Sequence, residues 1–157
     1  MNPPAEVSSD GITIRDVVST DRDQWEELWT GYTGFYRKTV APEITDLTFG
    51  RLCERDQGMF GLVAESRAGR LVGLAHCIPH RSTWSEGWKC YLEDLFVDRS
   101  SRGANVGAKL IEAAKERSRE EGANRLYWLT QPYNGAARSL YDQVGHLASR
   151  VVYESNL

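Results

Sequence analysis

The chain lacks the features that mark secreted and membrane proteins. Its 157 residues include only three cysteines and no CxxC pair, which argues against a disulfide framework and favours reduced thiols in the cytoplasm. No apolar run is long enough to span a bilayer, and the first ten residues, MNPPAEVSSD, are too polar for a signal peptide. We therefore expect a cytoplasmic protein without a membrane partner.

The chain also lacks a strong charge of either sign. Its formal net charge is −3, so no basic field that would attract nucleic acid is predicted. The length and a hydrophobic content of 41% fit one domain with a real core. We expect a disordered leader over residues 1–10 and a single domain over residues 11–157, without internal repeats.

Hydrophobic spacing predicts a mixed α/β order of strand, helix, helix, three strands, helix, strand, helix and strand. The second and third strands should form a hairpin, because a short turn containing Gly69 joins them. The expected strands cover residues 12–18, 59–66, 70–79, 88–98, 124–131 and 147–155, and the expected helices lie after residue 21 and over residues 47–54, 103–121 and 132–144.

A turn rich in small residues, RGANVGA (102–108), opens the third predicted helix. The first backbone N–H groups of a helix are unpaired, and the helix dipole makes that end positive, so a phosphate group is a natural ligand. Gly103 and Gly107 would let a ligand approach the backbone, and Arg102 adds a cation. A helix entry that uses small residues only for packing is the alternative.

Two well-known phosphate loops do not fit this turn. A Walker loop would place lysine and then serine or threonine after Gly107, where the chain has Ala108 and Lys109. A dinucleotide fold would place its glycine turn after the first strand of a parallel sheet, whereas this turn follows a predicted hairpin.

Four segments between Leu71 and Gly145 carry a resemblance to the GCN5-related N-acetyltransferase (GNAT) superfamily. RGANVGAKLIEAA resembles the family's motif A, with Asn105 at the usual middle glycine, and LVGLAHC resembles its third strand. YLEDLFVD resembles a segment of spermidine/spermine acetyltransferases and their thialysine-acetylating relatives. YWLTQPYNGAARSLYDQVGH resembles motif B and is similar to a yeast group that acetylates histones and polyamines.

The resemblance implies the GNAT fold, an α/β architecture with a twisted, mostly antiparallel mixed sheet of six to seven strands and about four helices. It implies that acetyl-CoA binds where two neighbouring strands, 88–97 and 124–131, separate. The implied coenzyme contacts are the backbone of Leu95, Phe96 and Val97 for pantetheine, the turn Arg102, Gly103, Ala104, Asn105, Val106, Gly107 and Ala108 for pyrophosphate, and the motif B residues Asn134, Ala137 and Tyr141.

Transfer to an amine needs a base and an acid. Glu93 and Asp94 are the candidate bases, and strand alternation predicts that they point to opposite faces. The resemblance to the polyamine enzymes favours Glu93, acting through water, while solvated strand carboxylates are the alternative. Tyr141 is the candidate acid for the leaving thiolate; it shares a helix face with Asn134 and Ala137, although a core aromatic is the alternative.

The acceptor side is less sharply defined by the sequence. Tyr32 and Tyr36, near the end of the first predicted helix, are candidate acceptor contacts together with Glu93. His76 and His80 have i, i+4 spacing, but Pro79 and the strand pattern spoil a helical metal face, so no metal site is expected.

The prediction is an acetyl-CoA-dependent N-acetyltransferase in which a small primary amine, a polyamine or a lysine-like amino acid, attacks the thioester directly in a ternary complex. The alternatives are a protein or histone lysine acetyltransferase, an inactive acyl-CoA-binding module, and a phosphate-binding regulatory domain. A homodimer is expected from the resemblance, with the segment around 150–155 as a candidate for pairing across a twofold axis.

Overall fold

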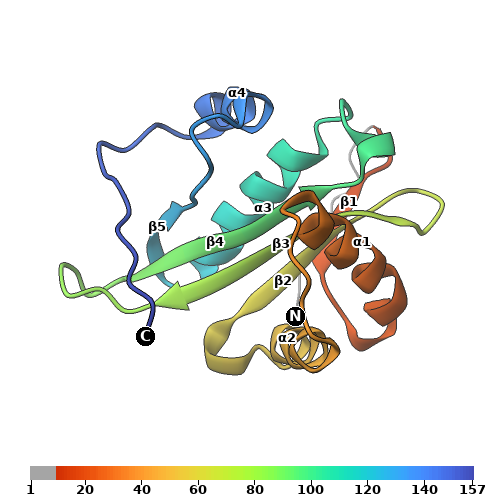
Figure 1. Cartoon of the computed structure of the whole chain (residues 1–157), viewed down its shortest axis with the longest axis horizontal. Coiled ribbons are helices and arrows are strands. Elements are labelled where there is room, and N and C mark those ends of the chain that lie inside the picture. Colours follow the sequence, from red (N-terminus) through yellow and green to blue (C-terminus); the bar gives the residue numbers. More distant parts are fainter. Residues whose placement is uncertain (1–9) are drawn as a thin grey trace.

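The computed structural model describes residues 10–157, which form a five-stranded sheet with helices on both faces (Figure 1). The strands lie in the order of the sequence, and the first four are antiparallel, while the fourth and fifth are parallel. They are β1 (Thr13–Asp16), β2 (Phe60–Glu65), β3 (Leu71–His80), β4 (Trp88–Val97) and β5 (Ala123–Tyr127). The predicted α/β class and the hairpin between β2 and β3 are confirmed.

Four α-helices and three short 3-10 turns complete the described chain. The α-helices are α1 (Arg22–Phe35), α2 (Pro42–Glu54), α3 (Val106–Glu120) and α4 (Gly135–Val144), and the 3-10 turns are η1 (Ser19–Asp21), η2 (Asp56–Gly58) and η3 (Arg99–Ser101). The helix α2 begins five residues before its predicted start, at Pro42, because proline fits the first position of a helix, where no N–H partner is needed.

The expected count of six to seven strands is wrong, because residues 147–155 form no strand in this structure. Their alternating apolar residues favour extended backbone, but a strand also needs a neighbour to pair with. This segment runs past the sheet without joining it (Figure 1), and the side chain of Tyr153 is 91% exposed. The β5 strand is also shorter than predicted and ends at Tyr127.

Two hydrophobic clusters hold the helices to opposite faces of the sheet. In β2, Leu62 belongs to the cluster under α3, while the next residue, Val63, belongs to the cluster under α1 and α2. This alternation follows from the two-residue period of a strand. The sheet therefore has a buried layer on each face. The β4 strand contributes side chains to both layers, for example Leu92 on the α3 side and Phe96 on the α1 side.

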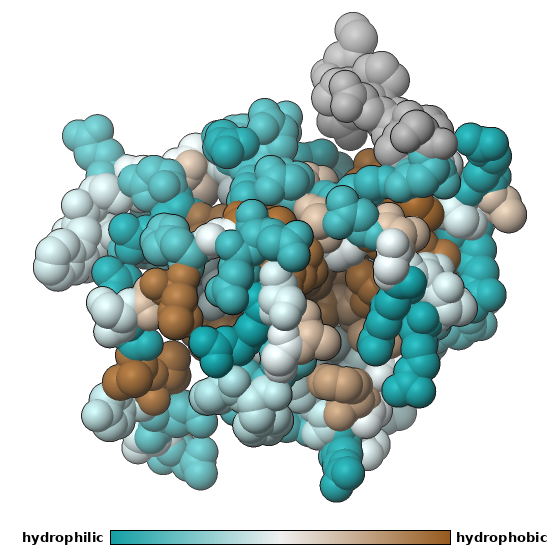
Figure 2. Space-filling model, turned by 90° about the horizontal axis from the view of Figure 1, so that it is seen from above, coloured by the Kyte–Doolittle hydropathy of each residue, from teal (hydrophilic) through white to brown (hydrophobic). Residues whose placement is uncertain are grey.

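The predicted leader, residues 1–10, lies outside the described residues except for Asp10, whose carboxylate pairs with Lys109 Nζ on α3. From above, the surface is mainly hydrophilic, with small separate hydrophobic patches on that face (Figure 2). Among residues 10–157, no helix is both long and apolar enough to cross a membrane.

Candidate active site

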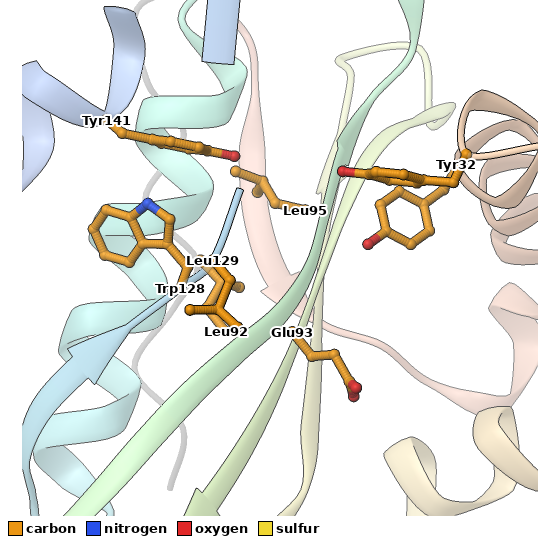
Figure 3. A pocket seen from close by; sticks show the side chains of 8 residues that line it. Tyr32, Leu92, Glu93, Leu95, Trp128, Leu129 and Tyr141 are labelled. Carbon is orange, nitrogen blue, oxygen red and sulfur yellow. The ribbon is translucent and has the colours of Figure 1, made fainter. Parts of the chain in front are cut away.

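A pocket opens where β4 and β5 separate. The pairing between these parallel strands ends at Tyr91 and Tyr127, and beyond that point the two chains diverge. The pocket is lined from both sides of this gap by Tyr32, Tyr36, Leu92, Glu93, Leu95, Trp128, Leu129 and Tyr141. Tyr141 and Trp128 extend from one side, and Tyr32 extends from the other (Figure 3). The structure thus brings together the sequence-predicted residues Tyr32, Tyr36, Glu93, Leu95 and Tyr141.

A β-bulge in β4 shapes this pocket. His76 of β3 pairs with Asp94, but the next residue, Cys77, pairs with Leu92, so Glu93 is an extra residue in β4. Because of this insertion, Leu92 and Leu95 both contact the cluster under α3. Both carboxylates, of Glu93 and of Asp94, consequently lie on the α1 side of the sheet. The expectation that they point to opposite faces is wrong, because simple alternation does not hold across a bulge.

The Glu93 carboxylate is suited to accept a proton. Burial raises its pKa above the ordinary value, and the negative charge of Asp94 raises it further. The side chain points away from Tyr141 (Figure 3). A carboxylate with a raised pKa is a stronger base than an ordinary glutamate. The position of Glu93 also separates it from the Tyr141 phenol, which would act as the acid.

Tyr141 comes from α4 and lies against Trp128, with ring centroids 5.6 Å apart in an edge-on arrangement. Burial, followed by the effect of Tyr36, raises the pKa of Tyr141 to about 12. The phenol therefore keeps its proton at neutral pH and can act as a donor. Gly145 makes this packing possible, because a Cβ there would lie 2.9 Å from the Trp128 ring.

Tyr32 and Tyr36 form the wall on the α1 side. Their rings meet edge to face, with centroids 5.1 Å apart. Burial and then the nearby Asp94 carboxylate raise the pKa of both phenols. Both hydroxyl groups are therefore neutral at physiological pH, and the aromatic faces beside two carboxylates suit a cationic acceptor.

The turn before α3 has the geometry of an anion site. Gly103 has a φ of 94° and Asn105 a φ of 60°, so both adopt left-handed backbone. The Lys109 amide donates to the Asn105 carbonyl, and the amides of Val106, Gly107 and Ala108 therefore precede the hydrogen-bond ladder of the helix. Asparagine tolerates this conformation better than most residues, so the turn keeps its shape without the usual glycine.

Gly107 also has a packing role. A Cβ at this position would lie 2.9 Å from Leu140 Cδ2 on α4, so the glycine lets the two helices approach closely. Asn134 begins α4, and its side-chain oxygen accepts a hydrogen bond from the Ala137 amide. The exposed Arg102 donates from Nε to the Val97 carbonyl at 3.4 Å, which holds it between the end of β4 and the turn.

Sequence reasoning missed four residues of the site. Leu92, Trp128 and Leu129 line the pocket, and the position of Trp128 and Leu129 just after a strand that separates from its neighbour was the available signal. His76 was considered only as a metal ligand, but its ring contacts Asp94. Nothing in the local pattern predicts that contact, because it depends on the register between two strands.

A family model described as "Acetyltransferase (GNAT) family" matches residues 22–146. The chain is 32% identical, over 98% of its length and 96% of the relative, to the D-amino-acid N-acetyltransferase HPA3 of Saccharomyces cerevisiae. It is 34% identical to the thialysine N-epsilon-acetyltransferase of Bos taurus, over 41% of this chain and 37% of that relative.

Solved structures share the fold at low identity. The aminoglycoside N-acetyltransferase AAC(6')-Iy in complex with CoA superposes with a TM-score of 0.80 at 17% identity, covering 99% of each chain. At this identity the likeness shows the arrangement of strands and helices alone.

Proposed function

The chain belongs to the acetyltransferase (GNAT) family, and from this premise we propose that it acetylates a small primary amine, a polyamine or the side-chain amine of a lysine-like amino acid. It is an N-acetyltransferase that uses acetyl-CoA. The observation that carries the choice of acceptor is the chemistry of the pocket. Its walls combine the rings of Tyr32 and Tyr36 with the Glu93 carboxylate, and Asp94 lies directly behind them.

The charge of the pocket favours an amine that has no carboxylate beside it. Among the described residues that line it, none is cationic. An α-amino group would bring its own carboxylate next to Glu93, at a cost in like-charge repulsion. A polyamine, or an amine at the end of a side chain, brings only positive charge to the carboxylates.

The turn and the separated strands fit acetyl-CoA, which supplies the acetyl group as a thioester. The amides of residues 106–108 and the Arg102 guanidinium would hold the pyrophosphate. Backbone groups of Leu95, Phe96 and Val97 would hold the pantetheine arm, and one N–H there would stabilise negative charge on the carbonyl oxygen. Ala137 and Asn134 would lie beside the same arm at the start of α4.

Glu93 and Tyr141 would manage the two proton transfers. An alkylamine is mostly protonated at neutral pH, with a pKa of about 10.4, so Glu93 takes one proton from it through a water molecule. The neutral amine then attacks the thioester carbonyl carbon directly in a ternary complex, and the C–S bond breaks after the C–N bond has formed. Tyr141 donates its proton to the departing thiolate. The nitrogen releases its second proton to solvent, and Tyr141 regains a proton from solvent.

A second acceptor class, D-amino acids, is favoured by the relative that matches nearly the whole chain. A panel of polyamines, lysine analogues, D-amino acids, aminoglycosides and histone peptides, assayed with one enzyme preparation, separates these classes. We expect polyamines or lysine analogues to give the highest kcat/KM. A preference for D-amino acids or histone peptides would refute the assignment of the acceptor.

Thermal unfolding tests the coenzyme separately from the acceptor. Saturating acetyl-CoA should raise the melting temperature, because a ligand of the native state stabilises it. A clear shift without acetylation of any amine would support an inactive acyl-CoA-binding module instead. No shift would argue against the whole assignment.

We also infer a cytoplasmic homodimer from two features of the described chain. Cys53, Cys77 and Cys90 are free thiols, which suits a reducing compartment. Several apolar side chains of the C-terminal segment are exposed, namely Leu147, Val151, Val152, Tyr153 and Leu157. Sedimentation of the full chain and of a chain ending at residue 146 tests the dimer: the full chain should be a dimer and the shortened chain a monomer.

A further inference from the structure

A chain of hydrogen-bonded polar side chains runs from α1 along the facing side of the sheet to the pocket. The Trp25 indole on α1 donates from Nε1 to His76 Nε2 at 2.9 Å. The other ring nitrogen of His76, Nδ1, lies 3.0 Å from Asp94 Oδ2. Trp25 is fully buried and His76 is only 3% exposed, so water has little access to either ring.

The chemistry of the indole fixes the direction of both hydrogen bonds. An indole N–H can only donate, so His76 Nε2 must be the acceptor. The proton of the neutral ring is then on Nδ1 and is donated to Asp94. The His76 ring also packs against the rings of Trp25 and Trp29, with centroids 5.7 and 5.5 Å away, and this packing holds its orientation.

Asp94 connects this chain to the pocket. Its side chain is 14% exposed and lies behind the residues that line the site. Its negative charge acts on the hydroxyl groups of both Tyr32 and Tyr36, which line the pocket. The titratable groups around Asp94 come from three elements: Tyr32 and Tyr36 of α1, His76 and Cys77 of β3, and Tyr91 and Glu93 of β4.

We propose that His76 is a positioning residue for the acceptor side of the site, an inference that rests on the proposed amine acetylation. With its tautomer fixed by Trp25, the Nδ1–H of His76 holds the Asp94 carboxylate against Tyr32. The fixed negative charge of Asp94 then orients the Tyr32 hydroxyl, which lines the pocket, and lies beside the base Glu93. Without that donor, the Asp94 carboxylate can rotate away, and its negative charge is no longer fixed beside Tyr32.

His76 does not itself exchange protons with the acceptor. Both ring nitrogens are engaged, Nε2 by Trp25 and Nδ1 by Asp94, so neither faces the pocket. Its effect must therefore pass through Asp94. If residue 76 served packing alone, an apolar side chain would suffice, because it avoids the cost of burying polar groups.

Two variants of His76 separate positioning from packing. In His76→Asn, the amide nitrogen falls near the place of Nδ1 and can still donate to Asp94. In His76→Gln, the longer amide reaches the place of Nε2 and can accept from Trp25, but no donor remains for Asp94. Each variant keeps one of the two hydrogen bonds, so the two should lose similar stability.

We expect His76→Gln to lower kcat/KM for the amine at least about tenfold, as befits the loss of a hydrogen bond to a charged group. His76→Asn should stay within about threefold of the wild type. The KM for acetyl-CoA should change in neither variant, because the hydrogen bonds from Trp25 through His76 lead only to Asp94, on the acceptor side of the site. Equal losses in both variants, with equal falls in melting temperature, would show a merely structural role and overturn the proposal.

Two further measurements do not depend on these variants folding. The ¹⁵N chemical shifts of His76 in the wild-type protein should show the Nδ1–H tautomer, and the Nε2–H tautomer would overturn the proposal even if no acceptor amine is ever found. Asp94→Asn should lower kcat/KM for the amine and move the acidic limb of its pH profile to lower pH, because the charge that strengthens Glu93 is gone. An unaltered profile would equally overturn it.

Discussion

Replacing Gly107 by alanine tests whether this glycine serves the contact between α3 and α4. The new Cβ would lie 2.9 Å from Leu140 Cδ2, whereas packed carbon atoms are about 3.5–4.0 Å apart. The Leu140 side chain or the helices must therefore move. Forcing a methyl group into a packed contact costs about 1–3 kcal/mol, and alanine returns up to about 1 kcal/mol through its helix propensity. We expect a net loss of about 1 kcal/mol in the free energy of unfolding.

A double-mutant cycle with Leu140→Ala isolates this contact. In the Leu140→Ala background the methyl group has space, so Gly107→Ala should be neutral or stabilising by up to about 1 kcal/mol. Urea unfolding of the four proteins gives the required free energies. If Gly107→Ala costs the same in both backgrounds, the contact with Leu140 is not what requires the glycine, and the reasoning is refuted.

The same four proteins separate packing from coenzyme binding. The neighbours of the added Cβ are the side chains of Leu140 and Val97, so we expect the methyl group to leave the turn accessible. Calorimetry should then give the double variant the acetyl-CoA affinity of Leu140→Ala, within about twofold, the usual error of additivity. A large extra loss would show that the coenzyme itself needs a bare backbone at position 107.

Three other substitutions test the proposed chemistry. Tyr141→Phe should lower kcat about 10²–10⁴-fold, as expected for a general acid, with the acetyl-CoA dissociation constant nearly unchanged; undiminished turnover would remove that role. Because burial and then Asp94 raise the pKa of Glu93, the deprotonated base should be lost as pH falls through a value above the ordinary glutamate range. Glu93→Gln should abolish this acidic limb of kcat/KM, and a limb that persists would point to another base. Asn105→Gly should preserve or tighten acetyl-CoA binding, because glycine adopts the observed φ of 60° without strain; a large loss would mean that the amide side chain holds the ligand.

The order of helices and strands was predictable because each element carries its own periodicity. The hairpin between β2 and β3 and the helix α3 follow from local patterns that tertiary packing reinforces. The absent C-terminal strand marks the limit of this reasoning. The segment RVVYES has the alternation of a strand, but alternation does not supply a neighbour, and in the single chain its residues remain exposed.

The pocket residues were predictable only where a motif fixes their position. The sequence placed Tyr141 and Glu93 near the coenzyme through resemblance, and the structure does bring both to one pocket. It did not predict that Asp94 shares the face of Glu93, since that depends on one inserted residue in the pairing with β3. A bulge changes which face a side chain takes without leaving a signature in the composition of the strand.

Two packing features fix the proposed functional groups relative to one another. The contact of Gly107 connects the coenzyme turn to the acid, and the bulge in β4 connects the base to Asp94. Gly107 lies in the turn proposed to hold pyrophosphate, and it packs against Leu140, the residue before Tyr141. Any change that separates α3 from α4 therefore moves the proposed acid as well as the turn. On the opposite wall, the bulge sets Glu93 and Asp94 side by side, so a change in the register of β3 against β4 would alter the base and its charged neighbour together. A substitution at Leu140, which contacts Gly107, or one at His76, which pairs with Asp94 beside the bulge, should therefore affect kcat, although neither residue lines the pocket.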